Sequence, residues 1–291
     1  MKPVLTEGRR GDPSPGASED AGGAALFTIG YDGGFEGFLC AVAEALNASR
    51  SGLPLPSISC PAARAELFDE TIAIPADAAR ARRLWERLAA RAGAQALLTC
   101  REAFCSDFAA KEDPLARALV RMYREGASAL KDLVDPDICF VEKAAFRAQA
   151  QAHLIAGLLR FAELEDGSWY APIEPDCDVL PLIGDHFAAR YADMSFAIHD
   201  TRRGKALLHS PGRPWRVIEG FRLIPGEKGK DEGADAPSFP YSEGELAIRS
   251  GWVRYFNAVA IAQRENPRLQ AGRMPRKYWH LLPEMRSPDA P

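Results

Sequence analysis

The chain has 291 residues, of which 47% are hydrophobic, 26% charged and 9% aromatic. These values are typical of a folded globular protein and exclude a fibrous or wholly disordered chain. The formal net charge of −4 gives no global basic excess that would attract nucleic acid. No apolar run approaches the length of a membrane span, and the first residues lack the apolar core of a signal peptide. We therefore expect a cytoplasmic protein with no membrane partner.

Composition divides the chain into five segments. Residues 1–24 are rich in Gly, Pro, Ser and acidic side chains and predict a disordered tail. Residues 225–242 have the same character and predict a flexible linker or insertion. The remaining segments are expected to be a mainly helical region over 25–157, an α+β region over 158–224, and a basic, aromatic helical region over 243–291.

Apolar side chains recur at helical spacing through the first ordered region. Residues 35–46 predict an amphipathic helix, and residues 77–91 predict a second one with arginines on its outer face. Asp113-Pro114 is expected to supply the cap and first turn of a third helix. Residues 142–156 predict a fourth.

The next region changes to the pattern of strands. Residues 158–173 predict a β-hairpin that turns at Asp166-Gly167. Residues 180–191 predict a helix, residues 194–209 predict a second hairpin, and residues 215–224 predict a further strand. Hairpin, helix and hairpin in this order predict an α+β fold, with an antiparallel sheet and the helix packed on one face.

Neither the cysteines nor short motifs indicate a cofactor. The six cysteines form no Cys-x-x-Cys pair, and nothing in the sequence places a histidine beside one. Gly33-Gly34 lacks the other glycines of a dinucleotide fingerprint, and no Walker lysine follows them. We predict free thiols of a reducing compartment and no resident cofactor.

Charge is unevenly distributed along the chain. Residues 163–200 hold nine acidic side chains and one arginine, whereas residues 201–224 hold six basic side chains and one acidic one. Residues 249–280 hold seven basic side chains and one acidic one. The near-neutral total therefore hides an acidic middle flanked by basic segments.

The C-terminal basic segment interleaves arginines with aromatic side chains. Guanidinium groups neutralise phosphates and aromatic faces stack on unpaired bases, as binding to single-stranded or damaged DNA requires. The candidate nucleic-acid-binding residues are Arg160, Arg254, Arg268, Arg273, Arg276, Lys277, Tyr278 and Trp279. In the alternative interpretation, Trp252, Phe256 and Val259 fill the core face of a helix and the arginines are solvated.

The acidic middle offers an alternative function. Its donor side chains suit a metal-assisted nuclease or base-modifying hydrolase. The catalytic candidates in that interpretation are Glu174, Asp176, His186, His199 and Asp200. Roles for Asp166, Asp178 and Asp200 in turns and caps explain much of the cluster without a metal. Because no compact ligand motif is present, the main interpretation includes no metal ion.

Two further side chains have local predictions. Arg160 is expected to pair with Glu174 across the first hairpin. His153 lies at helical spacing from apolar residues and is expected to be a packed core histidine.

Several sequence blocks, taken together, resemble a known bacterial family. The blocks are 31–39 (YDGGFEGFL), His153 with 157–161 (GLLRF), 170–176 (YAPIEPD), 180–187, 198–200 (IHD), Trp252 with 255–256, 266–270 (NPRLQ) and 274–279 (MPRKYW). In this order they resemble a domain-of-unknown-function family described as probable DNA metabolism or putative DNA repair proteins. The blocks extend over roughly residues 25–285.

The resemblance implies partners. Members of that family are usually encoded beside a radical-SAM protein of DNA modification or repair, and in some bacteria they are fused to a uracil-DNA-glycosylase-like domain. It thus implies an accessory protein that binds single-stranded or damaged DNA and acts with one of these partners. The enzyme alternative, with the 174–200 cluster as its site, stays open.

Overall fold

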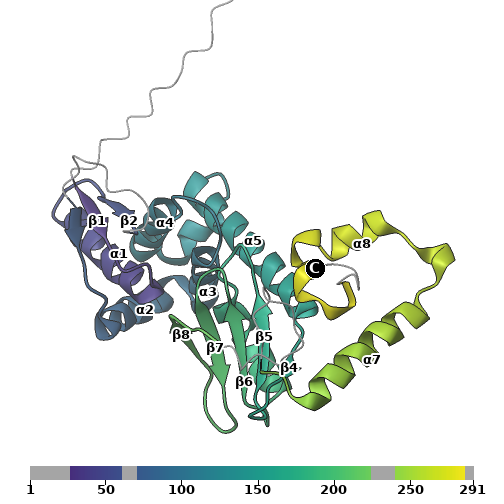
Figure 1. Ribbon diagram of the computed structural model, residues 1–291. Coiled ribbons are helices and arrows are strands. Elements are labelled where there is room, and N and C mark those ends of the chain that lie inside the picture. The colour runs from purple at the N-terminus through teal and green to yellow at the C-terminus, as the bar shows by residue number, and fades with distance from the viewer. Residues whose placement is uncertain (1–26, 61–70, 224–239, 286–291) are drawn as a thin grey trace, which may run out of the picture.

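The computed structural model describes residues 27–60, 71–223 and 240–285 (Figure 1). The expected disordered tail over 1–24 lies outside these residues, as does most of the expected linker over 225–242. In the described residues, helices and small sheets are combined, so the α+β class is confirmed. No described helix has both the length and the apolar character needed to cross a membrane.

The first half is mainly helical, but it also contains a sheet that the sequence analysis did not predict. Strand β1 (Thr28–Gly30) lies between β2 (Ser57–Ser59) and β3 (Thr71–Ala73), and both pairings are parallel. Around this sheet lie four helices, α1 (Phe35–Arg50), α2 (Ala78–Ala92), α3 (Ala94–Phe104) and α4 (Glu112–Glu125), and the 3-10 turn η1 (Gly126–Lys131). Their apolar faces form one core together with β1 and β2.

A tight turn connects β1 to α1. The Asp32 carboxylate accepts a hydrogen bond from the Gly34 backbone N–H at 2.9 Å. Gly33 has a φ of +87°, which glycine adopts without a steric penalty. A Cβ at Gly37 would lie 2.1 Å from the same carboxylate, so the turn requires glycine there.

Helix α5 (Pro136–Leu158) joins the two halves. It begins at an Asp135 cap, whose carboxylate accepts hydrogen bonds from the backbone N–H groups of the first turn. Ile138 and Val141 near its start belong to the first core, whereas Ala152 and Ile155 near its end belong to a second core. The halves are therefore connected by a helix that both cores bury.

The second half contains a five-stranded sheet. Its strands are β4 (Ala162–Glu163), β5 (Trp169–Ile173), β6 (Phe196–Asp200), β7 (Lys205–His209) and β8 (Arg216–Glu219), in that spatial order. The two predicted hairpins are confirmed as β4–β5 and β6–β7. The sheet is not antiparallel throughout, because β5 and β6 are parallel. Helix α6 (Leu180–Arg190) lies between them in sequence and returns the chain to the end of the sheet where β5 began.

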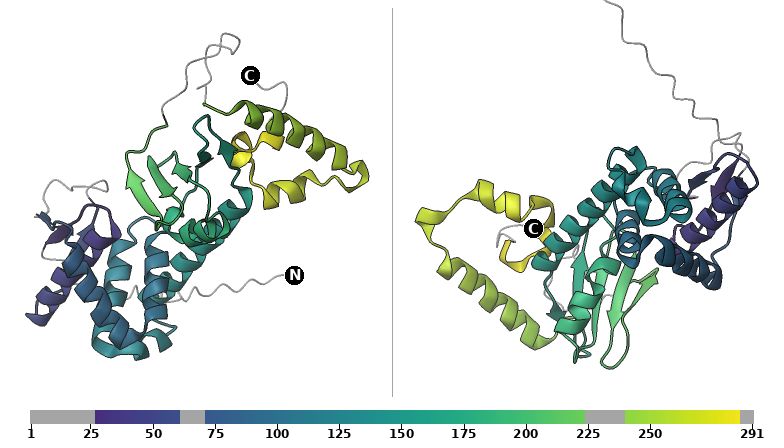
Figure 2. Two further views of the ribbon diagram at one scale, coloured as in Figure 1. Left: turned by 90° about the horizontal axis from the view of Figure 1, so that it is seen from below. Right: turned by 180° about the vertical axis from the view of Figure 1, so that it is seen from behind.

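The C-terminal elements leave the body beside β4 and return beside the end of α5 (Figures 1 and 2). They are α7 (Glu243–Val259), η2 (Ala262–Arg264), α8 (Pro267–Arg273), η3 (Arg276–Leu281) and η4 (Pro283–Met285). The helix expected over 273–282 is thus largely a 3-10 turn. We call residues 243–273 the arm.

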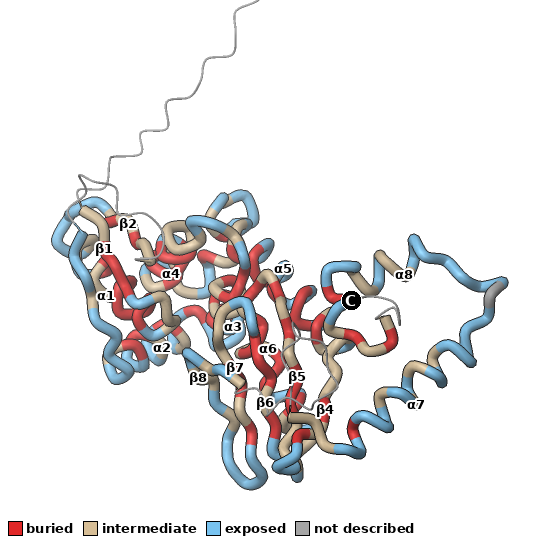
Figure 3. The backbone as a smooth tube through the Cα atoms, viewed as in Figure 1, coloured by how far each residue is buried: buried red, intermediate tan, exposed pale blue. Residues whose placement is uncertain are grey.

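The arm is largely exposed to solvent (Figure 3). Within α7, all of whose residues are described, Glu245 alone is buried. Trp252 is 41% exposed and Val259 52% exposed. The interpretation that Trp252 and Val259 fill the core face of a helix is therefore wrong, whereas Phe256 on the same face is half-buried.

Candidate nucleic-acid interface

A cleft lies where the edge of the five-stranded sheet meets α7. Arg160, Phe161 and Trp169 line two adjoining cavities at this position. The cavity on the α6 side has a volume of about 550 Å³ and is also lined by Arg190. The cavity on the α7 side has a volume of about 510 Å³ and is also lined by Trp252. We call the two together the aromatic–arginine cleft.

The aromatic wall of the cleft is positioned by the sheet. Trp169 opens β5 and pairs in register with Phe196 of β6. Phe161 immediately precedes β4, and its ring contacts those of Phe187, Tyr191 and Phe196 at centroid distances of 5.7, 5.3 and 5.3 Å. Both Phe161 and Trp169 are half-buried. Each therefore has one face fixed by packing while the ring still reaches the cavity.

The arginines of the cleft are held by specific partners. Arg160 donates to Glu284 at 2.7 Å, and Arg249 donates to Glu245 at 2.7 Å. The Arg249 guanidinium also lies over the Tyr241 ring, 4.2 Å from its centroid. The described residues that line the cleft include three arginines (160, 190 and 249) but one carboxylate, that of Glu245.

The apolar face of α7 continues this wall outward. Ile248 and Trp252 line the cleft, and Tyr255 and Val259 follow at helical spacing. Trp252 and Tyr255 lie with their ring centroids 5.8 Å apart at an angle of 31°. Exposed aromatic and aliphatic side chains thus extend from the cleft along the arm.

The predicted nucleic-acid-binding residues occupy different environments. Arg160 lines the cleft. Four arginines (254, 268, 273 and 276) are exposed, the first three on the arm and the last directly after it. Trp279 is half-buried and donates its indole N–H to the Met274 carbonyl at 2.8 Å. Tyr278 is 2% exposed and belongs to the second core, so its ring cannot stack on a base.

Lys277 is tied to the acidic segment. Its ammonium group lies 2.5 Å from an Asp176 carboxylate oxygen. The same carboxylate accepts hydrogen bonds from Arg202 at 2.9 Å and from Gln151 at 3.1 Å. These contacts, the Lys277 bond above all, lower the pKa of Asp176. The Asp176 carboxylate thus has a structural role, because it joins η3 to the segment that follows β5.

The other acidic and histidine candidates do not converge with Asp176 on one site. Buried Asp200 accepts hydrogen bonds from the Arg203 side chain at 2.8 Å and from two backbone N–H groups of the following turn. Buried His199 shares a hydrogen bond of 2.8 Å with the Tyr170 hydroxyl, and burial lowers the pKa of this histidine. Glu174 pairs with His280 at 3.1 Å.

His186 lies apart from these four residues, exposed on α6 and lining the cleft. Among the residues that the structure describes, no group of three or more His, Cys, Asp or Glu side chains is arranged to hold a metal ion.

Four of the six thiols also lack the features of a nucleophile. Burial raises the pKa of Cys100 and Cys105 to about 12 and that of Cys177 to about 11. A thiol with such a pKa is protonated near neutral pH and is a poor nucleophile. Cys139, the exposed cysteine, donates to the Leu133 carbonyl and has no histidine among its described hydrogen-bond partners.

Two local predictions were wrong. Arg160 pairs with Glu284, which is 124 positions away, and not with Glu174 across the hairpin. His153 is exposed on α5 and is not a core residue.

Several cleft residues were missed by the sequence analysis: Phe161, Trp169, Arg190, Tyr191 and Arg249. The signal that could have found them is the pair of aromatic side chains flanking the Asp166-Gly167 turn, close to Arg160. That signal is weak, because aromatic residues also fill the interior of many strands.

Comparison with known proteins gives a match at the level of the family. Residues 109–284, which are more than half of the chain, match the model of a family described as Domain of unknown function (DUF4130). No curated protein and no solved structure matches the chain significantly. The matched range contains the second half of the fold and the whole aromatic–arginine cleft.

Proposed function

We propose that this chain, which belongs to the DUF4130 family, is a DNA-binding accessory protein of DNA metabolism or repair. It takes single-stranded or damaged DNA into the aromatic–arginine cleft and along the arm. It works in the cytoplasm with a companion of the radical-SAM or uracil-DNA-glycosylase-like class. The observation that carries the proposal is the cleft itself, which is lined by three arginines and by the aromatic rings of Phe161, Trp169, Phe187, Tyr191 and Trp252.

The chemistry of the cleft suits unpaired bases. Phe161, Trp169 and Trp252 offer aromatic faces, and stacking on such faces contributes about 1–3 kcal/mol per base without requiring a particular sequence. A paired base in a duplex cannot reach a half-buried ring, whereas an unpaired or displaced base can. The cleft therefore favours single strands and lesions over intact duplex.

The arm supplies contacts for the phosphates. Arg254, Arg268 and Arg273 are exposed, and none of them is hydrogen-bonded or ion-paired to a described acidic side chain. Guanidinium groups that are free of carboxylates can replace the counterions of a nucleic-acid backbone. The proposed binding should therefore weaken as salt concentration rises.

A direct test compares two substitutions on α7. Trp252→Ala removes an aromatic face of the cleft, and Leu246→Ala removes an apolar side chain of the same helix that is 53% exposed and does not line the cleft. The readout is the fluorescence anisotropy of a labelled single-stranded oligonucleotide. We expect Trp252→Ala to weaken binding about 5- to 150-fold and Leu246→Ala to leave it unchanged. Equal effects of both substitutions, or no binding by the unsubstituted protein, would refute the proposal.

The partner component of the proposal is supported by the sequence resemblance. It is tested by affinity purification of the full chain from its native host with nuclease treatment, followed by mass spectrometry. Recovery of a radical-SAM or uracil-DNA-glycosylase-like protein is the expected result. If neither is recovered even after cross-linking in the cells, the protein acts without these companions.

A further inference from the structure

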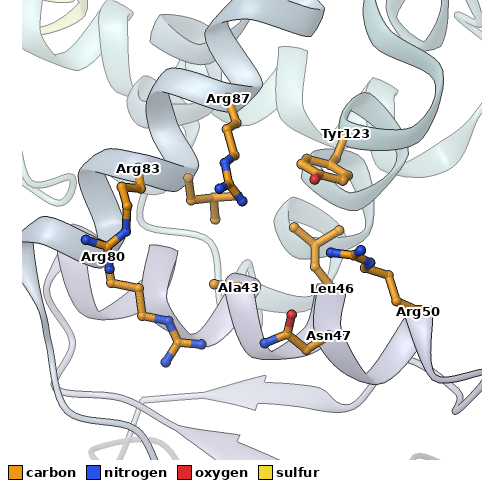
Figure 4. Close-up of a pocket in the computed structure, with 9 residues that line it drawn as sticks. Ala43, Leu46, Asn47, Arg50, Arg80, Arg83, Arg87 and Tyr123 are labelled. Atoms are coloured by element: carbon orange, nitrogen blue, oxygen red, sulfur yellow. The ribbon is translucent and has the colours of Figure 1, made fainter.

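Another cavity lies between α1 and α2, at the other end of the molecule from the arm (Figures 1 and 4). Its volume is about 240 Å³. The rim is formed by Arg50 of α1, by Arg80, Arg83 and Arg87 of α2, and by Tyr123 of α4. We call it the arginine cavity.

The arginine cavity follows directly from helical spacing. Residues 43, 46, 47 and 50 lie on one face of α1, and residues 80, 83, 84 and 87 lie on one face of α2. The two faces oppose each other. Leu46 and Leu84, each 6% exposed, form the floor. The long arginine side chains therefore stand at the rim, and Figure 4 shows Arg87 and Arg50 reaching into the space between the helices.

The charges of this cavity are only partly neutralised. Glu44, beside the cavity, pairs with Arg80 at 2.5 Å. Arg50, Arg83 and Arg87 form no hydrogen bond or ion pair with another described residue, although the charge of Arg83 contributes to lowering the pKa of Asp77 at the start of α2. No acidic side chain is among the described lining residues.

Several other arginines of the same half are paired with carboxylates. Arg82 pairs with Glu86 at 2.9 Å, Arg117 with Asp137 at 2.8 Å, and Arg147 with Asp107 at 2.8 Å. Three guanidinium groups of like charge around one cavity repel each other, and an anion between them would relieve that repulsion. The fold thus places three arginines without a described carboxylate partner around this cavity.

We propose that the arginine cavity binds a phosphate-bearing ligand. Planar guanidinium groups match the oxygens of a phosphate through paired hydrogen bonds. The cavity is smaller than the roughly 300–1,000 Å³ typical of sites that enclose a whole small molecule. It therefore holds one or two phosphate groups, while the rest of the ligand stays outside. A free nucleotide and a nucleic-acid strand both carry this group.

This proposal does not rest on the function proposed above. Except for Tyr123, the cavity's lining residues precede the matched range 109–284, and the cavity shares no residue with the aromatic–arginine cleft. Either site can be removed by substitution while the other is retained.

The test measures binding of inorganic pyrophosphate to the full chain by calorimetry. The variant Arg83→Gln/Arg87→Gln removes two cavity charges. The matched control Arg82→Gln/Arg213→Gln removes two exposed charges that do not line the cavity. We expect binding to weaken at least about tenfold in the first variant, the effect of losing a charge-assisted hydrogen bond, and to stay unchanged in the control. No binding by the unsubstituted chain, or equal weakening in both variants, overturns the proposal.

Two further ligands identify the source of the phosphate. ATP and a single-stranded oligonucleotide are titrated into the same three proteins. Loss of ATP affinity in Arg83→Gln/Arg87→Gln alone identifies a free nucleotide as the source. Loss of oligonucleotide affinity in that variant alone identifies a nucleic-acid strand. The Trp252→Ala variant, measured in parallel, separates failure of the cavity from failure of the cleft.

Discussion

The ion pair between Arg160 and Glu284 should fix the end of the chain to the body. Glu284 is nearly inaccessible, with a side chain that is 2% exposed, and Arg160 is the partner of one of its oxygens at 2.7 Å. The second carboxylate oxygen is buried and has no hydrogen-bond partner in the described chain. Arg160→Ala would leave this charge buried and uncompensated.

The expected cost follows from the burial of the pair. Removing one partner of a buried ion pair destabilises a protein by about 3–5 kcal/mol. The Arg160 side chain is 31% exposed, so water screens the pair and we expect about 2 kcal/mol. Glu284→Gln keeps the side-chain volume and one hydrogen-bond acceptor, and should cost about 1 kcal/mol.

Urea denaturation of both single variants and the double variant measures the coupling between the two side chains. We expect a coupling of about 1–2 kcal/mol, and faster hydrogen exchange in residues 276–285 of Arg160→Ala. A loss below about 0.5 kcal/mol with no coupling would show that the pair does not hold the segment.

Three other substitutions test packing and charge. Asp113→Ala removes the acceptor of two hydrogen bonds from β2, at 2.6 and 2.7 Å, and should lower the free energy of unfolding by about 1–2 kcal/mol in urea denaturation. The Arg147 guanidinium lowers the pKa of Asp107 to about 2. Because the folded pKa lies below the unfolded value of 3.8, this stabilisation is present above pH 4 and is lost as the pH falls toward 2. We expect a loss of about 1 kcal/mol after solvent screening, and Arg147→Gln should abolish it. Gly184→Ala places a Cβ 2.6 Å from the Trp215 ring and should cost about 1–3 kcal/mol in thermal or urea denaturation.

For each of these three substitutions, one outcome would contradict the expected effect. Asp113→Ala would contradict the reasoning if it unfolded like the original chain, since β2 would then be held by other contacts. An acid profile that is unchanged by Arg147→Gln would show that Asp107 does not depend on this arginine. A neutral Gly184→Ala would mean that Trp215 moves without cost.

Elements defined by local pattern were predicted well. Residues 77–91 were expected to be helical, and α2 covers Ala78–Ala92, because apolar side chains at helical spacing bury one stripe. The Asp166-Gly167 turn is confirmed because the Asp166 side chain accepts hydrogen bonds from Ser168 within the turn itself. Asp200 likewise accepts from the backbone of the turn that follows it.

Features that depend on distant partners were not predicted. Strand β1 has three residues, and its strand partners lie in distant parts of the sequence, so no local pattern marks it. Asp113 was expected to cap α4, but its carboxylate binds Ser57 and Ile58 of β2 instead. For α7, apolar spacing indicates a face to be covered but does not say by what, and in the described chain Trp252, Tyr255 and Val259 of this face stay exposed.

The charge pattern illustrates the same limit for the site. The acidic segment offered several candidate metal ligands. In the structure, however, Asp176 pairs with Lys277 and Arg202, and Asp200 pairs with Arg203. Basic residues that flank the acidic segment in sequence therefore neutralise these two carboxylates in the fold. Sequence separation alone could not show which charges would meet.

In the proposed complex, unpaired DNA bases lie against the aromatic side chains of the cleft. Photo-cross-linking with a single-stranded oligonucleotide containing 5-iodouracil, followed by peptide mapping, tests this most directly. We expect cross-links at Phe161, Trp169 or Trp252, and their loss under an excess of unlabelled single strand but not of duplex. Cross-links confined to other parts of the chain, or none at all, would contradict it.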